Sequence, residues 1–191
     1  MNMPKSITLF FAVSLFATLT VTQPLAPAFA DDADDAEDAA TEAARLTEEL
    51  DYFFTTGRCV KCDLSKADFS GRDLSGARLT SAMLEGANFT GADLRRAKLG
   101  NAKMGGANLT GANLRGANLK GADLSEANLT DANFREADLT GSNLSAANLD
   151  GADFWGAEIR RADLTKLKVE NTRGITKDEV GSSGKISIFD R

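Results

Sequence analysis

Histidine is absent from this sequence, and other residues that often build active sites are scarce. The 191 residues include two cysteines, one tryptophan, one tyrosine and no histidine. A histidine general base and a c-type haem attachment are therefore excluded. No nucleophile paired with a base is visible either, so the sequence predicts a protein that is not an enzyme and binds no cofactor and no metal.

Long apolar runs are also absent, apart from a single run near the N-terminus. Residues 7–21 are largely apolar, follow Lys5, and precede the small-residue sequence Ala28-Phe29-Ala30. The run is shorter than the roughly 20 residues that cross a bilayer, so an uncleaved membrane anchor is the less favoured alternative. We predict a signal peptide over residues 1–30, with cleavage between Ala30 and Asp31. The mature protein is then exported to the periplasm or the extracellular space, with no membrane association after cleavage.

An acidic segment follows the predicted cleavage site. Seven of the twelve residues 31–42 are Asp or Glu. Blocks of like charge are usually solvated, so residues 31–40 are predicted to be a disordered N-terminus. Cation binding by these carboxylates is a weaker alternative, because coordination requires an ordered loop.

A short amphipathic pattern comes next. Leu46, Leu50 and either Phe53 or Phe54 recur at helical spacing on one face. We expect residues 41–57 to form a helix that covers the exposed end of the domain that follows. Binding of a partner by this helix is the alternative.

The rest of the sequence is dominated by a period of five residues. An apolar residue stands at every fifth position from Leu64 to Leu164, and an alanine precedes most of these residues by two positions. This period matches neither an α-helix nor a flat, half-buried strand. The pattern predicts a repeat architecture of about 21 units.

The repeating units resemble those of the pentapeptide repeat proteins. Residues 87–91 read Ala-Asn-Phe-Thr-Gly and residues 122–126 read Ala-Asp-Leu-Ser-Glu. Both are similar to the family's Ala-(Asp/Asn)-Leu-x-x unit. The resemblance implies an all-β fold, a right-handed quadrilateral β-helix of about five coils over residues 58–171. Residues 172–191 are then expected to be a C-terminal cap and tail.

Two cysteines stand where the predicted helix meets the first repeat. The sequence Cys59-Val60-Lys61-Cys62 supplies only half of a four-ligand zinc site. We expect a structural disulfide, as is usual in oxidising compartments. A redox-labile pair and unpaired or intermolecular cysteines remain alternatives, because a Cys-x-x-Cys bridge is often reducible.

Four units per coil would stack residues that are twenty positions apart. One side of the solenoid then carries a candidate interaction surface, the arginine face. It consists of Arg95, Arg96, Arg115, Arg135 and Trp155. Arg and Trp are frequent anchors of protein interfaces. The competing interpretation is that these arginines pair with Asp93, Glu136 and Asp153 on the same side.

The resulting functional prediction is an exported structural or protein-interaction scaffold with an unknown protein partner. It is expected to be a monomer or a weak homo-oligomer in the periplasm, or in the thylakoid lumen of a photosynthetic source. A redox-responsive regulator that uses Cys59 and Cys62 is one alternative. Another is a DNA mimic that inhibits an enzyme such as gyrase, as the resemblance suggests for some members. Residues 58–171 contain 16 basic and 15 acidic residues, a balance that disfavours mimicry and predicts no nucleic-acid binding.

Overall fold

The computed structural model describes residues 33–175, with the backbone alone for residues 33–40 and 42. The predicted signal peptide, its cleavage site at Ala30 and Asp31, and residues 176–191 lie outside the described residues. Within the described part, no helix is both long and apolar enough to cross a membrane.

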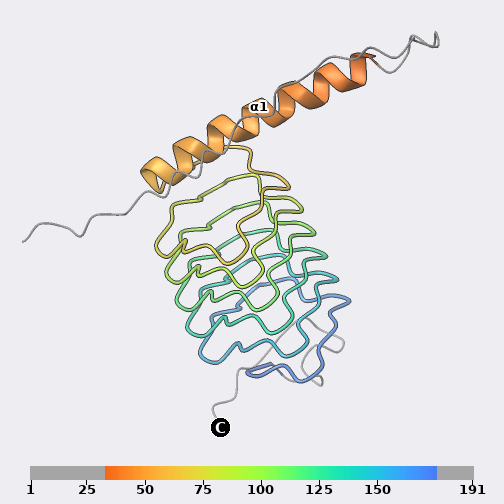
Figure 1. Cartoon of the computed structure of the whole chain (residues 1–191). Helices are drawn as coiled ribbons and strands as arrows, with labels where there is room; N and C mark the ends of the chain where they lie inside the picture. The colour runs from red at the N-terminus through yellow and green to blue at the C-terminus, as the bar shows by residue number, and fades with distance from the viewer. Residues whose placement is uncertain (1–32, 176–191) are drawn as a thin grey trace, which may run out of the picture.

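A solenoid of stacked coils forms most of the molecule, with one helix across its N-terminal end (Figure 1). Parallel β-bridges join residues that are twenty positions apart, from Arg58↔Arg78 to Asp153↔Arg173. The bridges fall into four columns, so each coil has four sides and each side is one five-residue unit. The predicted quadrilateral arrangement of the repeat is therefore present over the described coils.

The coils contain isolated bridges rather than continuous strands among the described residues. A turn interrupts the backbone in every unit, which leaves each side too short for a longer ladder. In one unit, Asn108 N donates to Ala87 O at 2.9 Å, and Leu109 N donates to Asn128 O at 2.7 Å. The unit thus bonds to the coil before it and to the coil after it.

Each unit turns its corner through a left-handed residue. Ala112 N donates to Leu109 O at 3.0 Å, which closes a four-residue turn whose third residue, Gly111, has φ 64°. Glycine is the residue best suited to this conformation. The same position also holds residues with side chains, such as Ala146 with φ 58°.

The apolar residue that recurs at every fifth position is the central residue of its unit. Asn or Asp at the position before it stabilises the same turn. Asn108 Oδ1 accepts from Thr110 N at 3.2 Å, and Asp123 Oδ1 accepts from Ser125 N at 3.0 Å. The preference for Asn and Asp at this position therefore has a local cause, because their short side chains bond the backbone two residues later.

The axis of the solenoid is filled by the central residues. All 21 of them, from Leu64 to Leu164, are no more than 5% exposed. Phe69 and Phe89 stack with their ring centroids 4.9 Å apart, and Phe134 and Phe154 stack at 4.7 Å. The alanines between them are also buried, which leaves room for the large side chains of neighbouring units.

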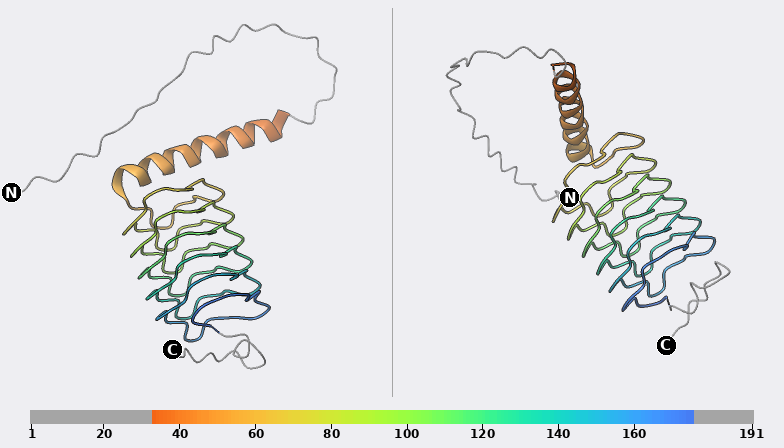
Figure 2. Two further views of the ribbon diagram at one scale, coloured as in Figure 1. Left: turned by 60° about the horizontal axis from the view of Figure 1, so that its bottom comes forward. Right: turned by 90° about the vertical axis from the view of Figure 1, so that its right-hand side faces the viewer.

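Helix α1 (Ala33–Thr56) covers the N-terminal end of the solenoid (Figures 1 and 2). Phe53 is 2% exposed and meets the Phe69 ring edge to face, with the centroids 5.8 Å apart. Leu46 and Leu50 are partly buried against the core. The predicted capping role of this helix is therefore supported by its contacts.

The start of α1 differs from the prediction. The helix begins at Ala33, within the segment 31–40 that was expected to be disordered. This segment is rich in alanine, the strongest helix former, and acidic residues near a helix N-terminus are favoured by the helix dipole. In this segment the helical propensity of alanine therefore outweighs the repulsion between the acidic side chains.

The solenoid also extends beyond the predicted units at both ends. Cys59 is 1% exposed and occupies the central position of an additional unit before Leu64. At the other end, a bridge reaches Arg173, and Ile175 is 3% exposed.

A glycine stands beside this last bridge. Gly174 has φ 81°, and a Cβ there would lie 2.8 Å from the backbone carbon of Phe154. The chain therefore requires glycine where it turns against the last coil.

Candidate interaction surface

The outer surface is the only part of the repeat that is accessible to a partner over the described coils. The central residues and alanines fill the axis, with an exposed fraction near zero in most units. A small-molecule site needs a cavity, whereas a protein partner needs only an outer face. The arginine face therefore has to be judged as a surface.

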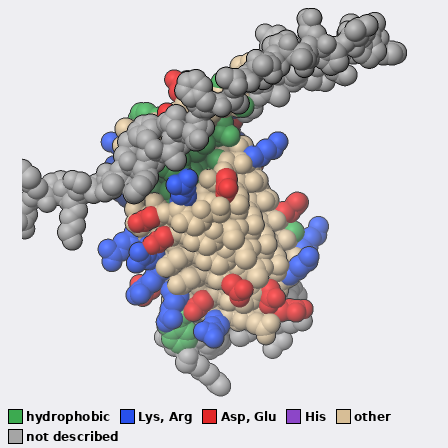
Figure 3. Space-filling view, viewed as in Figure 1, with side chains coloured by type: hydrophobic (Ala, Val, Ile, Leu, Met, Phe, Trp, Pro, Cys, Tyr) green, Lys and Arg blue, Asp and Glu red, His purple; other side chains and the backbone are tan. Residues whose placement is uncertain are grey.

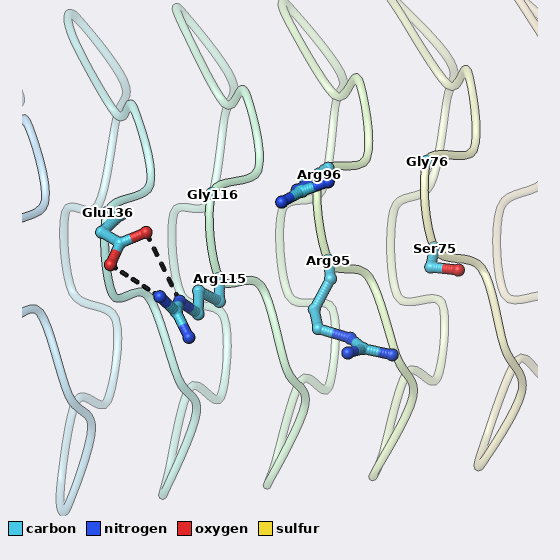
Figure 4. A pocket seen from close by; sticks show the side chains of 7 residues that line it. All are labelled: Ser75, Gly76, Arg95, Arg96, Arg115, Gly116 and Glu136. Atoms are coloured by element: carbon cyan, nitrogen blue, oxygen red, sulfur yellow. Dashed lines mark hydrogen bonds and ion pairs between the residues drawn. The ribbon is translucent and has the colours of Figure 1, made fainter.

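The structure brings the predicted arginines together on one side of the solenoid. Arg95, Arg115 and Arg135 each follow a bridge residue of the same column, which runs through Asp93, Asn113 and Asn133. Arg95, Arg96 and Arg115 line a shallow groove of about 560 Å³, together with Ser75, Gly76, Gly116 and Glu136. Figure 4 shows that the side chains of Arg95 and Arg96 point in different directions from one coil.

Carboxylates on the same side neutralise these arginines. Arg95 Nη2 lies 2.5 Å from Asp93 Oδ2, and Arg115 Nη2 lies 2.8 Å from Glu136 Oε1 on the next coil (Figure 4). Arg135 Nη1 lies 3.7 Å from Asp153 Oδ2. The competing interpretation is therefore confirmed for three of the arginines, because Arg95, Arg115 and Arg135 pair with Asp93, Glu136 and Asp153 respectively.

The pairing still leaves the arginine side chains exposed. The side chains of Arg95 and Arg115 are 55% and 56% exposed. Exposed ion pairs contribute little free energy, so a partner that offers carboxylates can exchange with the internal ones at low cost.

Asp93 and Arg95 influence each other's protonation. The hydrogen bond from the Arg95 guanidinium lowers the pKa of Asp93. In turn, the Asp93 carboxylate raises the pKa of Arg95. Both groups are consequently charged at neutral pH.

Trp155 lies at the C-terminal end of this row. The residue is 37% exposed, and its backbone N donates to Asp153 Oδ1 at 3.0 Å. It follows bridge residue Asp153 as Arg135 follows Asn133, one coil earlier. An exposed indole next to a row of guanidiniums is a typical composition for a protein-binding surface.

Charges of both signs are interspersed elsewhere on the molecule. Figure 3 shows a face made largely of uncharged polar side chains and backbone, with basic and acidic groups toward its edges. Along one column, Asn108 Nδ2 donates to Thr90 Oγ1 and Asn128 Nδ2 donates to Thr110 Oγ1, both at 3.0 Å. The Asn-x-Thr sequences of this column thus form a ladder of internal hydrogen bonds.

The two cysteines lie side by side at the N-terminal end. The Cα atoms of Cys59 and Cys62 are 5.6 Å apart, within the range that a disulfide spans. Cys59 is buried in the core, and Cys62 is partly buried against it. The geometry fits the structural disulfide that the sequence predicted.

Groups from α1 surround this cysteine pair and could not be assigned from the sequence. Asp63 N donates to Glu49 Oε2, and Arg45 Nη2 lies 2.8 Å from Asp63 Oδ2. Hydrogen bonds from Arg45, which has the largest effect, and from Ser65 lower the pKa of Asp63 to about 2. The helical pattern of Leu46 and Leu50 defines only the apolar side of α1, so it could not show that the first coil approaches Arg45 and Glu49.

Arg72 is another residue whose partner the sequence could not identify. It replaces the usual alanine of its unit, and its guanidinium lies 5.6 Å from the centroid of the Phe54 ring. This cation–π contact joins the first coil to α1. The repeat pattern shows that Arg72 is a departure from alanine, but it does not identify the contact with Phe54.

Comparison with known protein families gives a match over most of the solenoid. The model described as pentapeptide repeats matches residues 59–101, 92–131 and 127–165, with eight copies of the motif. A search of curated protein sequences finds no match.

Solved structures of repeat proteins are also similar. Rfr23, a pentapeptide repeat protein from the cyanobacterium Cyanothece 51142, is 26% identical with a TM-score of 0.60, over 67% of this chain and 98% of its own. A pentapeptide repeat protein from the Arabidopsis thaliana thylakoid lumen is 29% identical with a TM-score of 0.44, over 66% and 84%. HetL, involved in heterocyst differentiation regulation in the cyanobacterium Nostoc, is 24% identical with a TM-score of 0.36, over 73% and 98%.

Proposed function

The chain belongs to the pentapeptide repeat family, and we propose that it acts as a non-catalytic scaffold that binds a partner protein on the outside of its solenoid. The observation that carries this proposal is the filled axis. The central residues of the solenoid and nearly all its alanines are buried, so only outer side chains are available for recognition.

The arginine face is the surface that we assign to the partner. It combines exposed guanidiniums on successive coils with the exposed indole of Trp155. Arg and Trp are enriched among residues that dominate binding energy. The partner is expected to present carboxylates that replace Asp93 and Glu136 in the ion pairs, together with an apolar contact for Trp155.

Export is part of the proposal and rests on the N-terminal sequence. A basic residue, a short apolar run and a small-residue site precede Asp31. A mature N-terminus at Asp31, determined by mass spectrometry, is the expected result.

The DNA-mimic alternative is less favoured by this surface. Asp93, Glu136 and Asp153 each lie within 4 Å of an arginine nitrogen. A mimic of a nucleic acid instead needs a continuous row of unpaired negative charge. Mature protein is expected to leave DNA supercoiling by gyrase unchanged.

Site-specific photocrosslinking in intact source cells tests the scaffold. A photoreactive residue replaces Arg115 in one variant and Lys103 in another, since Lys103 is exposed and belongs to a bridge column two sides away. We expect a discrete cross-linked partner from position 115, not from position 103, and its loss when Arg135→Glu and Trp155→Ala are added. No partner at position 115, or the same partner equally at both positions, would contradict the proposal.

A further inference from the structure

Three potential metal ligands converge where α1 meets the first coil. They are the Sγ atoms of Cys59 and Cys62 and a carboxylate oxygen of Glu49, and all three atoms lie within 4.8 Å of one another. The cysteines come from the first unit of the solenoid, whereas Glu49 comes from the helix ten residues earlier. The sequence alone offered only the two cysteines, which are half of a zinc site.

The combination of ligands points to a thiophilic divalent cation. Zn²⁺ is bound by Cys thiolate and by carboxylate, often with a Cys-x-x-Cys pair among its ligands. Two thiolates disfavour Mg²⁺ and Ca²⁺, which require oxygen ligands. Three protein ligands leave one tetrahedral position for water.

The surrounding contacts hold the Glu49 carboxylate in place. Its Oε2 accepts from Asp63 N, and its Oε1 lies 3.9 Å from Arg45 Nη1. Arg45 in turn is bonded to Asp63 at 2.8 Å. Such outer contacts orient ligands in known metal sites and raise their affinity.

The site is also accessible from solvent. A surface depression is lined by Glu48, Glu49, Tyr52, Cys59 and Cys62, together with Arg45. Glu49 and Cys62 are partly exposed in this depression, so a hydrated ion can reach them from solvent, while Cys59 is buried. Glu48 lines the same depression but does not belong to the converging group.

We propose that the dithiol form of this protein binds one Zn²⁺ through Cys59, Cys62 and Glu49. The disulfide form does not bind it. A dithiol reductant transfers two electrons and two protons to the Cys59–Cys62 bond and becomes a disulfide itself, which leaves two thiols. Binding of the ion then displaces the two thiol protons, so the metal and the disulfide are alternative links at one place.

The structural consequence differs between the two states. A disulfide links only Cys59 and Cys62 within the first unit. The metal would also bind Glu49, and so would attach α1 directly to the coil that it covers. This inference is independent of the arginine face, which lies along another part of the solenoid.

Metal titration of the purified chain tests the proposal. The chain is reduced with a phosphine, and the phosphine is then removed in the absence of oxygen. The reduced chain is titrated with Cd²⁺ in the presence of excess Mg²⁺. The Mg²⁺ occupies carboxylates elsewhere on the surface, so that Cd²⁺ reports the sulfur site. The thiolate-to-cadmium charge-transfer absorbance reports sulfur ligation, and competition with a chromophoric chelator gives the Zn²⁺ affinity. We expect one equivalent per reduced chain and none per oxidised chain.

Matched variants separate the roles of the two glutamates. Glu49→Gln is expected to weaken Zn²⁺ binding by about tenfold or more, whereas Glu48→Gln leaves the affinity unchanged. Zn²⁺ should also raise the thermal midpoint of the reduced wild type more than that of Glu49→Gln. The proposal is overturned if the reduced wild type gives no charge-transfer band, if the oxidised chain binds equally, or if Glu49→Gln binds Zn²⁺ as tightly as Glu48→Gln.

Discussion

At the scale of single residues, the turn position of each unit decides which glycines are required. Gly105 and Gly106 are adjacent, but only Gly106 has a positive φ, at 64°. A Cβ on Gly106 would meet nothing within 4 Å, and one on Gly105 would make ordinary contact with Ser125 at 3.6 Å. Substituting each glycine in turn therefore distinguishes the cost of backbone strain, at Gly106, from the cost of side-chain crowding, at Gly105.

We predict that Gly106→Ala lowers the free energy of unfolding by about 1 kcal/mol, because an L-residue is strained in the left-handed region. Gly105→Ala should be neutral or slightly stabilising, since it restricts the unfolded chain without strain. Urea denaturation of the two variants provides the measurement. An equal loss of stability in both would show that crowding, not φ, determines the glycine requirement.

A second prediction at this scale concerns pH. The bond from Arg95 lowers the folded-state pKa of Asp93 below its unfolded value. The stabilisation is thus complete above about pH 4 and is lost as pH falls through the lowered folded pKa. Asp93→Asn should make the loss of stability between pH 5 and pH 3 less steep, as measured by urea unfolding at each pH.

The coupling of the two residues supplies the control for this pH effect. Arg95→Gln should reduce the slope in the same way, and the double variant should add little to either single one. If the effects of the two single variants on the pH dependence of stability add up in the double variant, Asp93 is stabilised by groups other than Arg95.

At the scale of elements, α1 acts as the cover of the first coil. Phe53 is buried against Phe69, whereas Phe54 is 50% exposed beside Arg72. We predict that Phe53→Ala destabilises the cap by about 3–5 kcal/mol, as for other buried phenylalanines. Phe54→Ala should cost much less, because a half-exposed ring loses less buried area.

Hydrogen exchange of the α1 amides is the appropriate measurement for these two variants. A cap that opens locally should lose protection in residues 46–56 before the solenoid does. Equal protection in the Phe53→Ala and Phe54→Ala variants would indicate that the helix is held mainly by Leu46, Leu50 and the Arg45–Asp63 ion pair.

The solenoid and α1 differ in how well the sequence predicts them. Central residues of the solenoid, such as Leu109, were identified because the period of five is kept without interruption from Leu64 to Leu164. The start of α1 at Ala33 was missed because charge and helix propensity gave opposite indications. Contacts such as Arg72 with Phe54 and Glu49 with Asp63 depend on how the helix crosses the coil, which no local pattern encodes.

The candidate surface was predicted more completely than the site at the cysteines. Residues that are twenty apart stack, so the arginine face and its pairing acids follow from counting alone. Cys59 was not recognised as the central residue of a unit, because a cysteine replaces the usual Leu or Phe. Its place in the unit is evident from the structure, because Cys59 is 1% exposed and its backbone N donates to Arg78 O at 2.7 Å, as the N of Leu109 donates to Asn128 O.

At the scale of the whole molecule, stability is expected to depend on contacts between neighbouring coils. Leu109 is fully buried in a middle coil, and Leu164 is 4% exposed near the C-terminal end. We predict that Leu109→Ala lowers the free energy of global unfolding by about 2–5 kcal/mol. Leu164→Ala should have a smaller global effect, because a terminal coil can open without disrupting the rest.

Denaturant unfolding combined with hydrogen exchange tests this difference. Loss of protection should centre on the coils adjoining residue 109 in the first variant and remain near the C-terminal end in the second. Uniform loss across residues 58–173 in both would indicate a solenoid that unfolds as one cooperative unit.

The order of the bridges also determines how the protein responds to pulling. Successive coils are joined by hydrogen bonds that run along the axis, and the described ends of the chain lie at opposite ends of the solenoid (Figure 2). Tension between these ends acts first on the outermost coils, so coils detach one after another instead of shearing together. Each detached coil of twenty residues supplies about 70 Å of slack. The described coils are therefore expected to lengthen the molecule in steps under load, one coil at a time.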